Sequence, residues 1–476
     1  MVFIHESLTP VAVAVGGLIA SITYIILLSI YRLTLHPLSK YPAPLLWKIS
    51  HLPKEYHLFK GTLTYRTAEL HEKYGPVVRL APNTLTYILE DAWTDIYGRP
   101  APRNTQLIKD DAQFVPLGDS APGLLMEPDD NEHARIRRNL NPGFSDKAVR
   151  DQEPIVKKYV DLLMQRFREN CHKPVNAVMW FNSTTFDIVG DLTFGESFDC
   201  LETSKLHFFV VTILTALKSI LFMGILKGYG LHKILFAMTP KSVQQKLEDH
   251  LGVTANRLKT RMESKSSRQD FLTLTMKQLN QPNGVSIEEL HATTGTLIFA
   301  GAETTATLLS GCIYFLAANP PHLPCPRRRD PQHLHLGIRN RHGIPPASFN
   351  RVTPPSGCSI AGSYIPGNTV VAVNQWSANH STLNFARPYE FLPQRWLGDA
   401  EFEGDKRKAM QPFSVGPRGC LGKSLAYAEM RLILARFVWN FNVELGEGME
   451  GWAEKQKVWL VYDKPELLVK LTPVKR

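Results

Sequence analysis

The segment that most constrains this chain is a loop near its C-terminus, FSVGPRGCLG, which runs from Phe413 to Gly422. Its cysteine, Cys420, stands between glycines, directly before a predicted helix that begins near Lys423. Backbone N–H groups at the start of a helix stabilise an anion, so Cys420 is placed to be a thiolate. The glycines permit a tight turn and the close approach of a flat ligand. The loop therefore predicts a thiolate site for a flat ligand, with Arg418 available to pair with a carboxylate of that ligand.

The rest of the chain is predicted to be mainly helical with small β-sheets. Apolar residues recur at helical spacing in the segments 64–74, 131–139, 146–170, 183–194, 241–263, 286–318 and 424–440. Shorter runs typical of β-strands occur at 77–80, 84–89, 369–373, 458–462 and 467–471. The sequence has no repeating βαβ rhythm and no internal repeat. We therefore expect one large helical domain with small sheets.

The N-terminus is predicted to be a membrane anchor. No charged residue lies between Ser7 and Tyr31, and about 20 helical residues rise ~30 Å, which spans the hydrocarbon core of a bilayer. A cleaved signal peptide usually starts with basic residues, whereas here Arg32 and Lys40 follow the span. By the positive-inside rule this places the body in the cytosol. We expect an anchor over 1–32 and a cytosolic domain over 33–476; a buried core helix is the alternative.

Composition narrows the possible partners and the redox compartment. The formal net charge of +10 suits an anionic partner such as nucleic acid, an acidic protein or a membrane surface. Zinc-finger spacings, RNA-binding signatures and long Lys/Arg tracts are absent from the sequence, so we expect no nucleic-acid partner. The 6 cysteines are far apart and form no CxxC pair, which excludes a disulfide scaffold.

The pattern FxxGxRxCxG of residues 413–422 resembles the haem-binding loop of the cytochrome P450 monooxygenases. The resemblance implies the cytochrome P450 fold, haem b as cofactor and Cys420 as the iron ligand, with Phe413, Arg418 and Gly422 as haem contacts. In this family the thiolate ligand generally pushes electron density toward oxygen and favours O–O cleavage. The resemblance also implies electrons from NADPH through a reductase, docked on basic residues such as Arg137, Arg138 and Lys423. The alternative is a free cysteine in a glycine-rich turn.

A second motif lies in the long segment 286–318. Its sequence AGAETT, residues 300–305, resembles the oxygen-activation motif of the same family. A hydroxyl within a helix can hydrogen-bond back to a carbonyl and bend the helix, and beside Gly301 this would open a groove for dioxygen. Glu303 and Thr304 would then relay protons. An ordinary amphipathic core helix is the alternative.

Further matches are spread along the chain. His133 and Arg137 lie one helical turn apart and resemble the pair that grips a haem propionate in this family; a solvated basic helix is the alternative. Arg351 resembles the strand arginine that meets a propionate, and Arg395 resembles the arginine of the segment before the haem loop. Two more stretches, 31–38 and 186–195, resemble fungal members that make secondary metabolites.

One expected motif is missing. The family carries an E-x-x-R pair that braces the arginine corresponding to Arg395, but no Glu occurs between Glu303 and Glu390. The segment 321–350 stands there instead, with six prolines, four histidines and five arginines. Our hypothesis is an out-of-frame or wrongly spliced segment. The alternatives are a divergent functional loop and a zinc site formed by Cys325, His333, His335 and His342, whose spacing fits no standard zinc pattern. On this view Arg395 lacks a partner, and the chain takes up little haem.

The sequence as a whole predicts a membrane-anchored haem monooxygenase of the endoplasmic reticulum, with its catalytic domain in the cytosol. It would insert one oxygen atom from O2 into a lipophilic small molecule, such as a terpenoid or polyketide of secondary metabolism. The apolar segment 208–226 favours a lipophilic substrate. An inactive or poorly folding remnant is the first alternative, and a haem sensor or carrier the second.

Overall fold

The computed structural model describes residues 10–101, 106–110, 113, 121–207, 218–219, 221–231, 241–264, 268–319 and 349–475. Most of the segment 321–350, up to residue 348, therefore lies outside the described residues, and so do residues 208–217 of the apolar segment. The chain is mostly helical with small sheets, as the sequence predicts.

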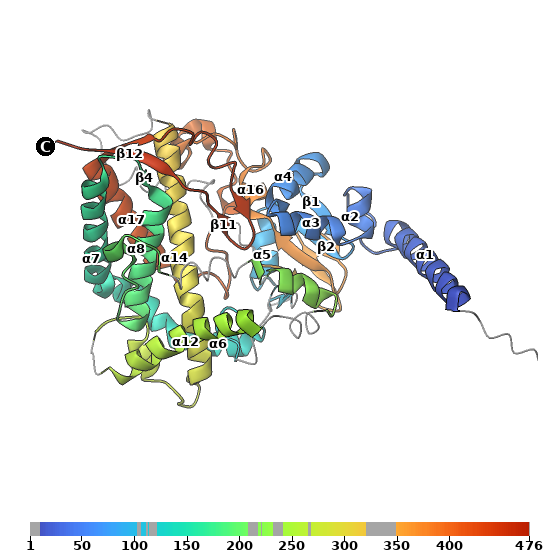
Figure 1. Cartoon of the computed structure of the whole chain (residues 1–476). Coiled ribbons are helices and arrows are strands. Elements are labelled where there is room, and N and C mark those ends of the chain that lie inside the picture. The colour runs from blue at the N-terminus through green and yellow to red at the C-terminus, as the bar shows by residue number, and fades with distance from the viewer. Residues whose placement is uncertain are drawn as a thin grey trace, which may run out of the picture.

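The helical half of the molecule is built around α14 (Ile287–Ala318), which Figure 1 shows crossing its middle beside α8 (Ala177–Phe194). From residue 305 to residue 317 every residue of α14 is buried, because this helix is apolar on all sides and packs against neighbours all round. It starts at a capping box, in which Ser286 and Glu289 each accept from the other's backbone N–H.

The remaining helices surround this core or cover the larger sheet. They are α1 (Pro10–Thr34), α2 (Leu45–Ile49), α3 (Leu52–Lys60), α4 (Leu63–Tyr74), α5 (Asp91–Tyr97), α6 (Asp130–Leu140), α7 (Asp146–Asn170), α9 (Cys200–Thr203), α12 (Lys241–Glu263), α13 (Thr273–Met276), α16 (Gln375–Asn379) and α17 (Lys423–Asn440). Both α7 and α17 pack with α8 and α14 into one apolar core.

The larger sheet has the strand order β1-β2-β8-β5-β3, and its β2–β8 pair is parallel while its other pairs are antiparallel. Its strands are β1 (Val77–Ala81), β2 (Thr84–Tyr87), β3 (Ile108–Lys109), β5 (Arg351–Val352) and β8 (Val370–Val373). Three small sheets comprise β4 (Val175–Asn176) with β12 (Leu468–Pro473) and β9 (Phe441–Leu445), β6 (Cys358–Ile360) with β7 (Ser363–Ile365), and β10 (Lys457–Val458) with β11 (Tyr462–Asp463).

The expected helices and strands are confirmed, with one correction. The segments 146–170 and 241–263 coincide with α7 and α12, and the others differ by a few residues at their ends. The run 458–462, however, is not one strand, because β10 and β11 pair antiparallel with Val458 opposite Tyr462. A period-two pattern of apolar residues does not distinguish a short hairpin from a single strand.

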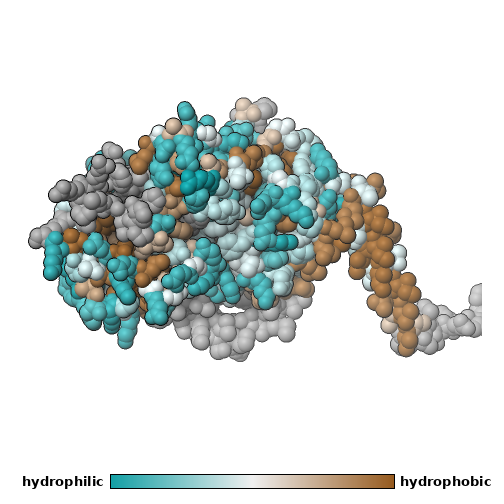
Figure 2. All heavy atoms as spheres, turned by 90° about the horizontal axis from the view of Figure 1, so that it is seen from above, coloured by the Kyte–Doolittle hydropathy of each residue, from teal (hydrophilic) through white to brown (hydrophobic). Residues whose placement is uncertain are grey.

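The apolar helix α1 stands clear of the body, and Figures 1 and 2 show it as a projecting hydrophobic rod. Its span Val11–Thr34 is long and apolar enough to cross a membrane, and none of it is buried. The buried Arg79 holds its end, donating to the Arg32 carbonyl at 2.9 Å and to the Pro82 carbonyl at 2.7 Å. The helix thus fits a membrane anchor whose last turn is fastened to the sheet. The other long apolar helix, α14, is mostly buried and is a core helix.

The segment 186–195 has a structural role in this chain. Asp187 accepts the backbone N–H groups of Phe198, Cys200 and Leu201, so it fixes the turn before α9. A Cβ at Gly190 would lie 2.8 Å from the Phe198 ring, so only glycine allows this contact. The stretch is therefore constrained by packing.

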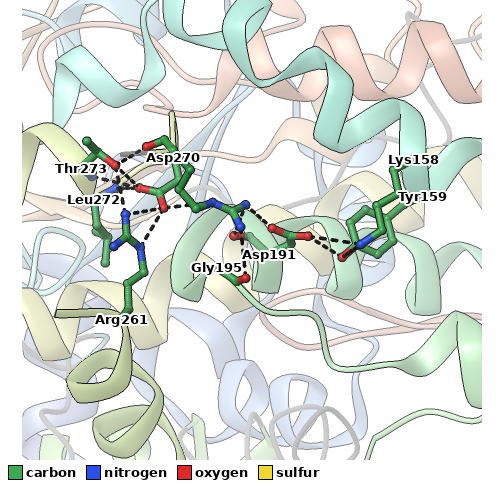
Figure 3. Close-up of polar contacts among 9 residues, drawn as sticks. Lys158, Tyr159, Asp191, Gly195, Arg261, Asp270, Leu272 and Thr273 are labelled. Carbon is green, nitrogen blue, oxygen red and sulfur yellow. Dashed lines mark hydrogen bonds and ion pairs between the residues drawn. The ribbon is translucent and has the colours of Figure 1, made fainter. Parts of the chain in front are cut away.

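A buried polar network begins at the end of the same segment (Figure 3). Asp191 accepts from the Tyr159 hydroxyl and pairs with Arg268. Next to it, Arg261 of α12 pairs with Asp270 at 2.8 Å, with 2% and 0% of their side chains exposed. Asp270 also accepts the backbone N–H groups of residues 272 and 273. The network joins α7, α8 and α12 without leaving a buried charge uncompensated.

Replacing Arg261 by Met should lower the free energy of unfolding by roughly 3 kcal/mol, because it leaves Asp270 as a buried charge without its closest cation. The measurement is the midpoint of urea denaturation. Lys157→Met is the matched control, since it removes an exposed ion pair with Asp161 whose side chains are 57% and 38% exposed, and such pairs contribute about 1 kcal/mol or less. Equal effects of the two changes would contradict the assignment of a buried network.

Candidate functional site

The Cys420 loop is held by its own backbone. The Cys420 N–H donates to the Phe413 carbonyl at 2.8 Å, and the Gly419 N–H donates to the Gly416 carbonyl at 3.0 Å. Gly416 has a φ of +77°, and a Cβ there would lie 2.2 Å from the Tyr97 carbonyl oxygen, so this position requires glycine. The Phe413 ring packs on Tyr427 of α17, with 5.0 Å between ring centroids. The loop is thus a rigid turn that leads directly into α17.

The electrostatic surroundings of Cys420 act in opposite directions. Burial raises the pKa of the thiol, while the backbone N–H of Gly422 and the charges of Arg137 and Lys423 lower it. The side chain is nevertheless exposed, so protein surrounds Cys420 without covering it. The expected stabilisation by the start of α17 is present, and an iron ion would add the positive charge that a coordinated thiol needs to remain a thiolate.

Helix α6 docks on this loop through two residues predicted from sequence, Arg137 on the helix and Arg418 on the loop. Arg137 donates to the Gly419 carbonyl at 2.6 Å, one residue before Cys420. Arg418 donates to Asp130, at the start of α6, at 2.9 Å and to the Glu127 carbonyl at 2.7 Å. The pairing that we expected for Arg418, with a ligand carboxylate, is thus taken by Asp130 in this structure.

A cluster of basic side chains forms between α6, the loop and the larger sheet. Burial lowers the pKa of His133 to about 3, with further lowering by Arg418, Lys109, Arg137 and Arg351. For Lys109, burial lowers the pKa to about 6, and the charges of Arg418 and Arg351 act in the same direction. Arg351 lies opposite Lys109 in the β3–β5 pair, and its pKa is lowered to about 10, mainly by burial.

The cluster brings together four residues predicted from sequence, namely His133, Arg137, Arg351 and Arg418. Lys109 is an addition that no local sequence pattern indicated. The carboxylates that act on Lys109 are Glu127 and Asp130, so the basic groups exceed the acidic ones. The Nε atom of Arg351 is buried without a hydrogen-bond partner among the described residues. His133 and Lys109 are mainly neutral at pH 7, but the guanidinium groups of Arg137, Arg351 and Arg418 still exceed the two carboxylates. This remaining positive charge and the orphaned donor suit an anionic ligand, and the two propionates of haem fit this donor set.

The expected proton relay on α14 is only partly reproduced. The Thr304 hydroxyl donates to the Ala300 carbonyl one turn earlier at 2.7 Å, as predicted for a hydroxyl within a helix. Ala300 is exposed and Thr304 half-buried, although the helix beyond them is fully buried. Thr304 therefore lies on the open face of an otherwise covered helix.

Glu303 points to different partners from Thr304. Its carboxylate pairs with Lys464, in the segment between β11 and β12, and its Oε1 lies 3.4 Å from the Thr307 hydroxyl. Both charged side chains are buried, with 1% of Glu303 and 3% of Lys464 exposed. Burial raises the pKa of Glu303, and Lys464 opposes this effect. The two adjacent residues therefore do not form a direct pair, because consecutive helical side chains diverge around the axis.

Gly301 has a different role from the one expected. A Cβ at this position would lie 2.9 Å from Val189 Cγ2 on α8. The glycine therefore allows α14 and α8 to approach closely, and it does not open the groove for dioxygen that the sequence suggested. The residues around it remain in regular α-helix.

The expectation that Arg395 lacks a partner is wrong. Arg395 forms an ion pair with Asp405, and only 1% of each side chain is exposed. Arg395 also donates to the Ala386 carbonyl at 2.8 Å, while the Ala386 N–H donates to Asp405 at 2.7 Å. The three residues close a small ring within the segment before the haem loop. An acidic residue ten positions later in the chain thus supplies the charge that the missing E-x-x-R pair would have supplied.

Comparison with known proteins agrees with this site. The sequence model of the family "Cytochrome P450" matches residues 37–323 and 342–471, and the chain belongs to this family. It is a haem monooxygenase of the fungal secondary-metabolite type, and the family takes its electrons from a redox partner.

Three curated relatives illustrate the similarity. Cytochrome P450 monooxygenase astA of Talaromyces wortmannii is 39% identical over 474 residues, which cover 95% of this chain and 96% of the relative. Averantin hydroxylase of Dothistroma septosporum is 38% identical over 490 residues, covering 97% and 92%. Averantin hydroxylase of Aspergillus parasiticus is 35% identical over 474 residues, covering 94% of each.

These matches bear on the alternative of an inactive remnant. The family model omits residues 324–341, which lie inside the segment 321–350 that replaces the E-x-x-R motif. It matches the chain on both sides, and Arg395 has Asp405 as its partner. The remnant alternative is therefore not supported, because its physical premise, an unpaired buried Arg395, does not hold.

Replacing Asp405 by Asn should lower the free energy of unfolding by roughly 3–5 kcal/mol, because it leaves Arg395 buried without a counter-charge. Thermal unfolding of the purified protein measures the effect. The control is Glu401→Gln in the same segment, whose ion pair with Arg387 is about half exposed, at 48% and 46%, and contributes little. If the Asp405 variant were as stable as the Glu401 variant, Arg395 would not depend on Asp405.

Proposed function

We propose that this protein inserts one oxygen atom from O2 into a lipophilic small molecule of fungal secondary metabolism, such as a terpenoid or polyketide. The observation that carries the proposal is the exposed thiol of Cys420 beside a buried cluster of basic groups with an unpartnered donor on Arg351. These features together suit a flat, dianionic iron cofactor. Two relatives are named for the hydroxylation of averantin, which supports oxygen insertion into a small molecule.

The residues that would hold haem follow from this arrangement. Cys420 would bind the iron, and the loop residues Phe413 and Gly422 would flank the ring. The guanidinium groups of Arg137, Arg351 and Arg418 would supply positive charge near the propionates, and His133 and Lys109 would supply hydrogen-bond donors. Haem bound in this way supplies the activation of dioxygen that is general in this family.

The chain's own side chains would deliver protons and exclude water. Thr304 lies on the open face of α14. Its hydroxyl donates a hydrogen bond to the Ala300 carbonyl, and the hydroxyl oxygen can accept a hydrogen bond from a proton donor. Glu303 is the neighbouring acid, so the two residues would move protons from the interior to the site of reaction. The covered half of α14, from residue 305 onward, excludes water from the rear of the site.

Electrons would come from NADPH through a membrane-bound reductase with an acidic docking face. Arg138 and Lys423 are exposed close to the Cys420 loop and suit such a face. Arg137 contributes less to docking, because it is half-buried and bound to Gly419.

We also propose that α1 anchors the protein in the endoplasmic reticulum membrane by a single span, over residues 1–32, with residues 33–476 as the cytosolic catalytic domain. The basic residues Arg32 and Lys40 after the span support this orientation. Helix α2 contacts α1 and carries the exposed apolar side chains of Leu45 and Leu46.

For the segment 321–350 we keep the hypothesis of an out-of-frame or wrongly spliced stretch, with a divergent loop as the alternative. The omission of residues 324–341 from the family match supports a foreign origin. Sequencing the genomic DNA and the transcript across codons 318–356 decides between the two, because a frame or intron error would appear there and a divergent loop would leave the reading frame intact.

The thiolate assignment is tested by Cys420→Ser. The reduced protein with carbon monoxide should lose the red-shifted Soret band of thiolate-ligated haem, because a hydroxyl donates far less electron density to iron than a thiolate. Cys171→Ser is the control, since Cys171 is a partly exposed cysteine on the C-terminal end of α7. Persistence of the band in the Cys420 variant would assign the ligand to another residue.

The anchor is tested by deleting residues 2–30, which keeps Arg32 and its contact with Arg79. The truncated protein should move from the membrane pellet to the soluble fraction after high-salt washing and retain its haem, because the apolar span is lost while the body is intact. The full-length protein treated in the same way is the control. Equal recovery of both in the pellet would contradict an anchor formed by α1 alone.

A further inference from the structure

We propose that Lys464 is a positioning residue for the proton relay: it fixes one carboxylate oxygen of Glu303 and leaves the other free to exchange a proton. This inference rests on the proposed function, because it concerns how Glu303 serves the reaction. Lys464 lies more than 160 residues from Glu303 in the chain and meets it only through the fold.

The contact joins Lys464 to two side chains in the middle of α14, Glu303 and Thr307. The Lys464 ammonium binds Oε1 of Glu303 and donates to the Thr307 hydroxyl at 2.8 Å. The Thr307 hydroxyl in turn donates to the Glu303 carbonyl at 2.8 Å. Lys464 therefore spans one turn of α14 and fixes the direction of the Glu303 side chain.

The second carboxylate oxygen of Glu303 is left over by this contact. Oε2 of Glu303 is buried and has no hydrogen-bond partner among the described residues. Most buried polar atoms in proteins are satisfied, so an orphaned acceptor calls for an explanation. An oxygen that remains available to take up or release a proton provides it.

Lys464 is the cation that opposes the effect of burial on Glu303. Glu303 is 1% exposed, and burial alone favours a neutral carboxylic acid. Among the described residues, the charges that act on Glu303 are Lys464, which favours the ionised form, and Asp463, which opposes it. Asp463 is itself paired with Lys218 at 3.0 Å on the surface. Lys464 therefore counteracts the effect of burial in part, and the pKa of Glu303 remains raised.

The position of Lys464 also connects Glu303 to the β10–β11 hairpin. This hairpin is held from other sides, because Lys218 lies over the Trp459 ring at 4.1 Å and the Trp459 indole donates to the Phe59 carbonyl at 3.2 Å. Lys464 follows directly after β11. The hairpin and the Glu303 carboxylate are therefore fastened to each other by one side chain.

The test compares Lys464→Met and Lys464→Arg with the double variant Lys464→Met/Glu303→Gln. Burial already raises the pKa of Glu303, and loss of the cation should raise it further, so the folded state of Lys464→Met should bind a proton that the unfolded chain releases. Its melting temperature should therefore fall, relative to the double variant, as the pH rises above ~4.5, the ordinary value for glutamate. The difference should level off above the raised pKa. Lys464→Arg should behave as the unmodified protein.

The control is Lys157→Met, which removes an exposed ion pair with Asp161 on α7 and no charge that acts on Glu303. Its pH dependence should match that of the unmodified protein. If Lys464→Met fails to fold, Lys464→Gln replaces it, because the amide keeps hydrogen bonds but not the charge. Parallel pH profiles for the single and double variants would overturn the proposal.

A second readout links the pair to the reaction. With NADPH and a fungal reductase, oxygen consumption by Lys464→Met and Glu303→Gln should fall by roughly tenfold or more, since positioned proton transfer contributes ~100-fold or more. Lys464→Arg should restore it. Full oxygen consumption in Lys464→Met would overturn the proposal. The thiolate-type carbon monoxide band of each variant is recorded separately. Absence of this band from every protein would count against the proposed function. The pH profiles of the melting temperature would still test the Glu303–Lys464 pair.

Discussion

The structure depends on the attachment of α6 to the loop that carries Cys420. Arg137 binds the Gly419 carbonyl, and Arg418 binds Asp130 at the start of α6. These two contacts place a helix and a turn from opposite halves of the sequence side by side. They also gather basic groups in the interior, where an excess of positive charge is unfavourable unless an anion accompanies it. The site is therefore prepared for a ligand that carries both an iron ion and carboxylates.

Two further buried ion pairs maintain this arrangement from a distance. Arg395 and Asp405 close the segment that precedes the loop, so the loop keeps a brace although the E-x-x-R motif is absent. Glu303 and Lys464 fasten the C-terminal hairpin to α14. A buried pair is strongly destabilising when one partner is lost, because the other remains as an uncompensated charge. Both pairs thus make the site sensitive to single substitutions far from Cys420.

The parts of the site that lie within one motif were predictable from sequence. The Cys420 loop, the His133–Arg137 turn and the hydroxyl bond of Thr304 follow from local spacing, and the structure has each of them. Lys109, Asp405 and Lys464 were missed, because isolated charged residues carry no periodic signal and their partners are set by the fold. Gly301 was misread for a related reason: its neighbour, Val189, lies on another helix.

The most direct test of this account is the haem content of the unmodified full-length chain, expressed with sufficient haem supply and purified in detergent. The Arg395–Asp405 brace and the basic cluster around Cys420 predict about one haem per chain, with a thiolate-type carbon monoxide spectrum. A preparation that is folded but nearly free of haem would contradict the account. It would show that the E-x-x-R pair, which the segment 321–350 lacks, has a role in haem binding that Asp405 does not replace.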